Sequence, residues 1–182
     1  MSVKLVGAAD LVLTSSTGKP YRPGEIVVAY HGTYGPVSAQ WIYSSAAVTV
    51  AGAPMYPVIA NWLPAGLYDC LEDENGAGVL GQELCAGSWL GGVQTAACFG
   101  FVQLTGWNLS AVTTDDSVPA LGWVGPSSTD GTWLGATLDA LTTDATNTGN
   151  TRSGFAPAAD GGTSMAVGTI LWHSPLSAPP TL

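Results

Sequence analysis

Charge is what this sequence has least of. Only 9% of its 182 residues are charged, with four Lys and Arg against thirteen Asp and Glu, whereas about 25% is usual for a soluble domain. No Asp, Glu, Lys or Arg occurs between residues 26 and 68 or between residues 84 and 114. Free monomers normally keep a charged surface for solubility, and the cores of protein interfaces are poor in charge and rich in aromatics. With seven Trp and six Tyr, the composition predicts a surface that packs against a partner.

Basic residues are too few and too scattered to form a nucleic-acid interface. Lys4, Lys19, Arg22 and Arg152 make no stripe that could neutralise phosphates. We therefore expect no direct contact with nucleic acid.

Long apolar runs are also lacking, although the mean hydropathy is positive at +0.27. The longest charge-free stretch is interrupted by glycine and proline between residues 52 and 64, before it reaches the ~20 apolar residues of a spanning helix. The N-terminal run reaches Asp10 without the long apolar segment of a secretory signal. We expect a protein that is made in a reducing cytoplasm and does not cross a membrane.

Cysteines number three, Cys70, Cys85 and Cys98. An odd count without C-x-x-C spacing matches no zinc set or disulfide framework. Three buried thiols are the favoured interpretation, and one disulfide is the alternative.

Residues for catalysis are scarce as well. His31 and His173 are the only two histidines, and neither lies in a recognisable Ser, Cys or Asp context. Asp115 and Asp116 are adjacent, so on a strand they would point to opposite faces and could not act together on one sugar. No phosphate-binding loop or dinucleotide motif occurs. We expect no catalytic residue, no cofactor and no enzymatic activity.

One acidic run has carboxylates that could bind a hard cation: Asp69, Glu72, Asp73 and Glu74. Their spacing is not that of an EF-hand loop. We favour a solvated acidic turn and assign no metal ligand, while the cation site stays open as the alternative.

The residues that are abundant predict β structure. Gly (24) and Pro (12) make up about a fifth of the chain. Short β-branched or aromatic runs between such turn residues, among them residues 25–32 and 46–52, predict strands, and in the second half of the chain they recur at spacings of roughly ten. Apolar and polar residues alternate between residues 36 and 45, as in a half-buried strand. The prolines of residues 53–68 argue against a central strand there. The one helical pattern, at residues 133–145, is weak. We predict an all-β fold with minimal helix, as a small β-barrel or β-sandwich with Gly/Pro-rich loops.

An acidic, glycine-containing turn after residue 70 divides the sequence into two candidate β lobes. Residues 1–70 form the first, with a Pro-rich extended segment, and residues 71–173 form a second, barrel-like or sandwich-like one. A Pro-rich tail, 174–182, follows.

Three residues are candidate interface residues. Trp62, between prolines, is the tryptophan we expect to be most exposed. Three prolines in the nine residues of the tail favour an extended arm, in which Leu176 and Leu182 are apolar anchors for a neighbouring surface. A frayed chain end is the alternative.

The C-terminal half resembles small virion proteins of tailed bacteriophages. That family layout has an aromatic-rich GxVQxxG strand, a pair of V-x-x-G strands, a D-G turn and a closing IG-x-A strand. The matching residues here are Gly100, Val102, Gln103, Gly106, Asp130, Gly131, Val167 and Gly168, whereas Ile170 stands where the layout ends in Ala. The resemblance covers about the last 85 residues, mainly 98–173.

The resemblance implies a capsid decoration (cement) protein on the capsid surface of the virion. Its partners would be the major capsid protein or other virion proteins, and further copies of itself, with a trimer favoured. Two alternatives remain: a carbohydrate-binding or adhesin-like β domain of a tail or fibre, whose tryptophans would stack on sugars, and a self-assembling surface or fibre protein.

Overall fold

The fold is almost entirely β, as predicted. The computed structural model describes residues 4–62, 65–73, 85–127, 129–136 and 153–173. Along the chain the elements are β1 (Lys4–Val6), the 3₁₀ helix η1 (Ala8–Val12), β2 (Thr14–Ser15), β3 (Ile26–His31), β4 (Gly35–Ser44), β5 (Pro54–Pro57), β6 (Asp69–Leu71), β7 (Gly87–Trp89), β8 (Cys98–Trp107), β9 (Val112–Thr113), β10 (Gly122–Pro126), β11 (Trp133–Ala136), β12 (Gly154–Ala156), β13 (Ser164–Met165) and β14 (Leu171–His173).

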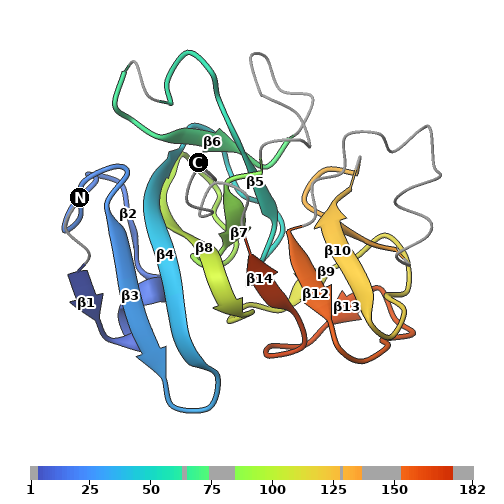
Figure 1. Cartoon of the computed structure of the whole chain (residues 1–182). Coiled ribbons are helices and arrows are strands. Elements are labelled where there is room, and N and C mark those ends of the chain that lie inside the picture. Colours follow the sequence, from blue (N-terminus) through green and yellow to red (C-terminus); the bar gives the residue numbers. More distant parts are fainter. Residues whose placement is uncertain (1–3, 63–64, 74–84, 128, 137–152, 174–182) are drawn as a thin grey trace, which may run out of the picture.

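One large mixed sheet organises these strands (Figure 1). Its order is β1-β3-β4-β6-β5-β7-β8-β14-β12-β10-β11, with β2 paired to β8, while β9 and β13 form a separate two-stranded ribbon. Because β4 also pairs directly with β8, the strands from β4 to β8 curl around a common core. Beyond that curl the sheet continues in both directions to the edge strands β1 and β11. The molecule is therefore not a closed barrel, and the barrel form of the prediction is wrong.

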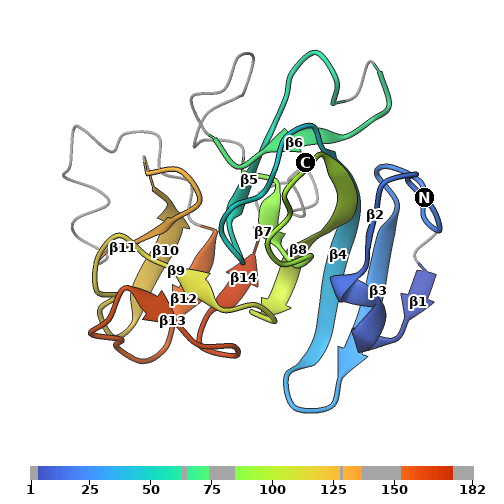
Figure 2. The same ribbon diagram turned by 180° about the vertical axis from the view of Figure 1, so that it is seen from behind.

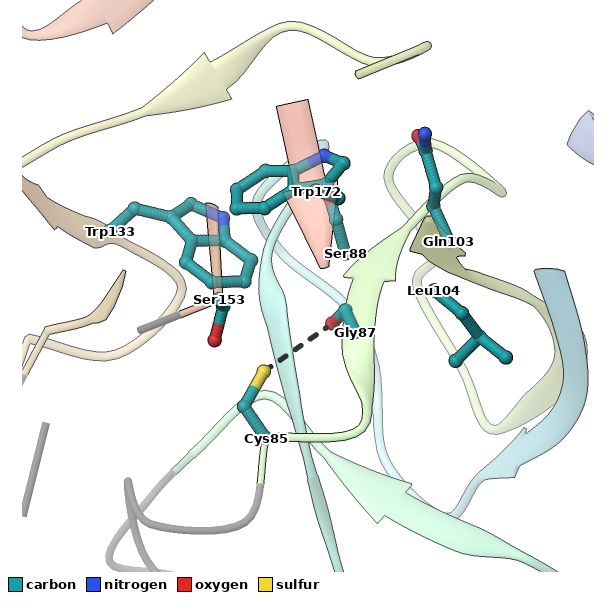
Figure 3. A pocket seen from close by; sticks show the side chains of 8 residues that line it. All are labelled: Cys85, Gly87, Ser88, Gln103, Leu104, Trp133, Ser153 and Trp172. Atoms are coloured by element: carbon teal, nitrogen blue, oxygen red, sulfur yellow. Dashed lines mark hydrogen bonds between the residues drawn. The ribbon is translucent and has the colours of Figure 1, made fainter. Parts of the chain in front are cut away.

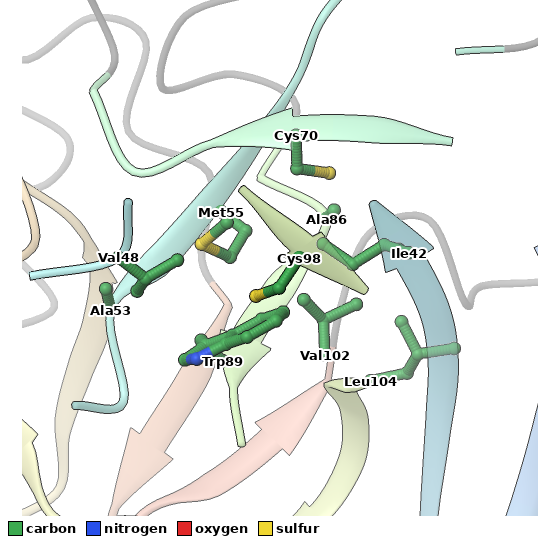
Figure 4. Close-up of a cluster of buried hydrophobic side chains, with 10 residues drawn as sticks. All are labelled: Ile42, Val48, Ala53, Met55, Cys70, Ala86, Trp89, Cys98, Val102 and Leu104. Atoms are coloured by element: carbon green, nitrogen blue, oxygen red, sulfur yellow. The ribbon is translucent and has the colours of Figure 1, made fainter. Parts of the chain in front are cut away.

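The antiparallel pair β4–β8 is the centre of the sheet. Each strand is ten residues long; six residues of β4 and six of β8 are buried. One side of the pair contributes Ile42 and Val102 to the cluster inside the curl (Figure 4), and the other contributes Trp41 and Phe101 to a second cluster. The alternation in residues 36–45 predicted a strand buried on one face only. Burial on both faces explains much of the missing charge, because a charged side chain in either cluster would be left without water.

Strand β5 corrects the expectation that the Pro-rich segment could not lie inside the sheet. It lies between β6 and β7. Pro54 and Pro57 are its two end residues, so the missing N–H groups fall at the ends, and Met55 and Tyr56 between them keep theirs.

Two segments differ from what one of their local sequence patterns indicates. Residues 133–136, which begin the predicted helical pattern, form strand β11, and the rest of that pattern lies outside the described residues. Residues 46–52, expected as a strand, make only the isolated bridge between Val48 and Gln94. The one described helix is the 3₁₀ turn η1, and no helix in the described ranges is long and apolar enough to cross a membrane.

The two candidate lobes share the large sheet, since β4 pairs with β8 and β5 pairs with β7. The division after residue 70 stays a prediction, and the tail 174–182 lies outside the described residues.

Candidate interaction surface

The large sheet has one covered face and one face that is partly open. In Figure 2 the helix η1, strand β2 and the β9–β13 ribbon lie in front of the sheet. Figure 1 looks at the opposite face, where β1, β3, β4, β8, β14, β12 and β10 follow one another. We call this the open face and define it by two groups of side chains, the β1–β3 patch and the aromatic row.

The β1–β3 patch comprises Leu5, Val28, Tyr30, Ser38 and Thr105. The register pairs Leu5 with Val28 and Val28 with Ser38, and paired residues project to the same face. Ser38 Oγ lies 2.6 Å from Thr105 Oγ1, which puts β8 on this face as well. Leu5 is 82% exposed and Tyr30 is 72% exposed. Two large apolar side chains therefore stand in solvent near the β1 edge of the sheet.

The aromatic row comprises Trp107, Leu171, Phe155 and Trp123, from the neighbouring strands β8, β14, β12 and β10. The register pairs each of the four with the next. Leu171 is 40% exposed and the three aromatic side chains are half-buried. The rings of Trp123 and Phe155 meet edge to face, with centroids 5.7 Å apart. The row is a continuous apolar strip across four strands.

None of the nine side chains in these two groups is charged. Lys4, the neighbour of Leu5, points to the covered face, where its Nζ lies 4.7 Å from the ring centroid of Tyr21. The open face is thus neutral although the chain carries a formal charge of −9.

The predicted interface residues lie elsewhere or outside the described residues. Trp62 is half-buried, packs against the cluster inside the curl and meets the Tyr68 ring edge to face at 5.0 Å. Leu176 and Leu182 lie outside the described part of the chain. The interface role of all three stays a prediction. Sequence reasoning missed the aromatic row because its members come from four separate strands, whose register the sequence does not reveal.

The two histidines end different strands, β3 and β14, which are separated by β4 and β8. His31 Nδ1 accepts the backbone N–H groups of Thr33 at 3.2 Å and Tyr34 at 3.3 Å, which closes the β3–β4 turn. His173 ends β14, opposite Thr105. The contacts of His31 are those of a turn residue.

Two described members of the acidic run, Asp69 and Glu72, bind different loops. Asp69 is buried and accepts hydrogen bonds from the Ser45 N–H and the Asn61 side chain at 3.1 and 2.9 Å. Glu72 is buried and accepts from the N–H and hydroxyl of Thr49 at 2.5 and 2.6 Å. Both carboxylates therefore hold loops of their own chain. Glu74 lies outside the described residues.

Asp115 and Asp116, although adjacent, have different surroundings. Asp115 accepts hydrogen bonds from the hydroxyls of Ser127 and Thr132, the latter at 2.9 Å, whereas Asp116 is exposed. Among the described residues no group of three or more His, Cys, Asp and Glu side chains is arranged to hold a metal ion.

All three cysteines are free, buried thiols, which confirms the favoured interpretation. Burial raises the pKa of Cys85 to about 12 and that of Cys70 well above its usual range, and it raises the pKa of Cys98 too. Thiols held in this protonated form are poor nucleophiles.

An interior gap between the curl and the C-terminal strands contains Cys85, Trp133 and Trp172 (Figure 3). It has no room for a water molecule. The two indole rings pack at 4.4 Å between centroids. The gap is a packing seam within the core and offers no access to a ligand.

Two of the motif residues that carried the resemblance, Gln103 and Gly106, have structural roles. Gln103 donates from Nε2 to the carbonyl of Trp107 at 2.7 Å and accepts the N–H of Leu109 at 3.0 Å, so its side chain holds the end of β8. Gly106 has φ +96°, and a Cβ there would lie 2.6 Å from the carbonyl oxygen of Pro36, so only glycine fits. Within the motif, Gln and the second Gly are therefore requirements of the fold.

Comparison with known proteins gives no independent assignment. No family model matches the chain, and no curated protein or solved structure matches it either.

Proposed function

We propose that the protein is a structural, non-enzymatic component of a larger assembly and that it acts by packing its open face against other proteins. The observation that carries this proposal is the neutral, apolar open face on an otherwise acidic chain. Exposed contiguous apolar surface of this kind is typical of interaction sites. The absence of charge and the presence of Trp, Tyr and Phe match the cores of protein interfaces.

Three carboxylates and two buried thiols support the same proposal, because each has a structural role in the fold. Asp69, Glu72 and Asp115 each bind loop N–H or hydroxyl groups, and the thiols of Cys70 and Cys85 are buried. Carboxylates and thiols also occur in catalytic and metal sites, but these have structural partners or lie in the core.

The specific assembly we propose is the virion of a tailed bacteriophage. In this role the chain would be made in the host cytoplasm and would bind the capsid surface as a decoration protein. It would contact the major capsid protein or other virion proteins and form homo-oligomers, with a trimer favoured. This part rests on the sequence resemblance, whose residues Gln103 and Gly106 maintain the fold.

A carbohydrate-binding role is the second candidate, because the aromatic row also offers rings to a sugar. Sugar stacking needs a ring face that is free and parallel to the surface. Trp123 and Phe155 pack edge to face on each other, so they do not form one flat platform. This geometry favours a protein partner.

The test is to locate the protein in particles. Particles from an infected culture would be purified on a density gradient and analysed by mass spectrometry, and the recombinant full chain would be added to particles that lack it. We expect the chain to band with the particles and to rebind them, with the Tyr30→Glu variant rebinding more weakly. Absence from the particle band, or binding of the chain to a glycan array with no rebinding to particles, would contradict the proposal.

A further inference from the structure

We infer that the aromatic row of one copy is the docking site for the Pro-rich tail, residues 174–182, of a neighbouring copy. This inference rests on the part of the proposed function that assigns packing to the open face, and not on the capsid. It names the occupant of the row as a segment of the same chain.

The chemistry of the two surfaces matches. The tail sequence SPLSAPPTL has three prolines, two leucines and no charged side chain. Proline-rich segments dock on aromatic-lined surfaces because their extended form loses little entropy on binding. The aromatic row offers Trp107, Phe155 and Trp123 around Leu171 without a charge that would need to be desolvated. An acidic or basic peptide would find no counter-charge in this row.

The length of the tail is sufficient. Four neighbouring strands at about 4.8 Å spacing make the row about 14 Å wide. Nine extended residues at about 3.1 Å each reach about 28 Å. The tail can therefore cross the row and still have about half of its length left to span the gap between two copies.

The direction of β14 favours a neighbouring copy over the chain's own row. The strand runs from Leu171, which is in the row, to His173, which is paired with Thr105 outside it. The end of β14, from which the tail continues, therefore points away from the chain's own row. The next position on that edge of β8, Gln103, is already paired with Ser88 of β7. Ser174 precedes Pro175, and a residue before proline disfavours the helical conformation that a tight reversal would use.

The test uses full-length chains with changes at each end of the contact. Leu171→Lys places a charge in the row, and Leu176→Asp with Leu182→Asp places charges in the tail. Val93→Lys is the matched control, because Val93 is an apolar residue that is 59% exposed and lies in the loop before the start of β8, whereas Trp107 of the row ends that strand. The mass of each protein would be followed by light scattering from micromolar to near-millimolar concentration, with circular dichroism as the check on folding.

We expect the parent chain and the Val93→Lys variant to associate. The row variant and the tail variant should each need at least a tenfold higher protein concentration to reach the same mass. Mixing the row variant with the tail variant should restore association in part, because one carries an intact tail and the other an intact row. Free SPLSAPPTL peptide in excess should dissociate the parent chain.

Three results would overturn the inference: a parent chain that stays monomeric throughout, a tail variant that associates like the parent, or a folded mixture that shows no recovery. If the tail variant associates normally but the chain still rebinds particles, the inference fails while the proposed function stands. If the tail contact is confirmed but the chain never bands with particles, the virion assignment fails alone.

Discussion

Asn108 Oδ1 accepts the backbone N–H of Ile170 at 2.7 Å, and so ties the end of β8 to the start of β14. The same oxygen accepts from Thr169 at 2.7 Å, and Nδ2 donates to the carbonyls of Ser110 and Ala166, both at 2.9 Å. Asn108 is fully buried. Replacing it with Ala would remove the partner of the buried Ile170 N–H, at about 1–3 kcal/mol, and of three part-buried backbone groups, at a smaller cost each because water can reach them. We expect Asn108→Ala to lower the free energy of unfolding by about 3 kcal/mol or more, measured by urea denaturation.

Ser110→Ala is the matched control for that change. Its hydroxyl makes only an exposed contact with Ala111, at 3.3 Å, so the expected loss is below about 0.5 kcal/mol. Equal losses in the two variants would show that the Asn108 side chain does not join the strands.

The buried thiols should make the protein less stable at alkaline pH. Below about pH 8.5, the usual pKa of a thiol, the cysteines are protonated in both the native and the unfolded protein. Above it the unfolded chain ionises, while Cys85, with a pKa raised to about 12 by burial, stays protonated in the native state. The free energy of unfolding should therefore fall by about 1.4 kcal/mol per pH unit for each such thiol. Denaturation at a series of pH values from 8 to 10.5 measures this slope.

Cys85→Ala separates the thiol from the other groups that titrate in that range. Its slope should be shallower than that of the parent by the contribution of one thiol, because the tyrosines and lysines are common to both. Parallel curves would mean that Cys85 ionises equally in the native and unfolded states.

The stability of the turn between β3 and β4 should depend on the Nδ1 atom of His31, which accepts two backbone hydrogen bonds there. His31→Ala removes the acceptor for the N–H groups of Thr33 and Tyr34, and we expect a loss of about 1–2 kcal/mol in urea denaturation. His31→Asn should lose less, because an Asn side-chain oxygen accepts from the residue two positions later in an Asx-turn. An Asn variant as unstable as the Ala variant would argue against this role.

Tyr30 should contribute to association and little to folding. The side chain is 72% exposed, so Tyr30→Glu should change the free energy of unfolding by less than about 0.5 kcal/mol. Its charge should weaken contacts made through the open face, seen as a lower mass by light scattering. Val93→Glu controls for adding an acid to an acidic chain. Equal association of both variants with the parent would remove the β1–β3 patch from the interface.

The sequence predicted the features that depend on local pattern. The β-branched run at residues 26–31 and the alternation after residue 36 predicted β3 and β4, and the three cysteines were correctly read as buried thiols. These signals reside in a few neighbouring residues.

Features that depend on pairing could not be predicted. The position of β5 inside the sheet depends on prolines that fall at both ends of the strand, next to β6 and β7. The charge-free segments indicated an exposed interface, yet much of their neutrality follows from the pairing of β4 with β8 in the core. The aromatic row exists only because β8, β14, β12 and β10 are neighbours in a register that no local pattern specifies.

The register shift in β8 also decides which side of the sheet carries Trp107. Ala39 is opposite Gln103 but Ser38 is opposite Thr105, so Leu104 is an extra residue in the pairing. Strict alternation from Phe101 would send every second side chain, including that of Trp107, to the covered face. The inserted residue reverses this parity and turns the indole outward. Deleting Leu104 would make the pairing regular and would leave Thr105 opposite Ser38 and Trp107 outward. The inserted residue is therefore what lets Phe101 and Trp107, six positions apart on one strand, project to opposite faces while Leu104 itself joins the cluster inside the curl.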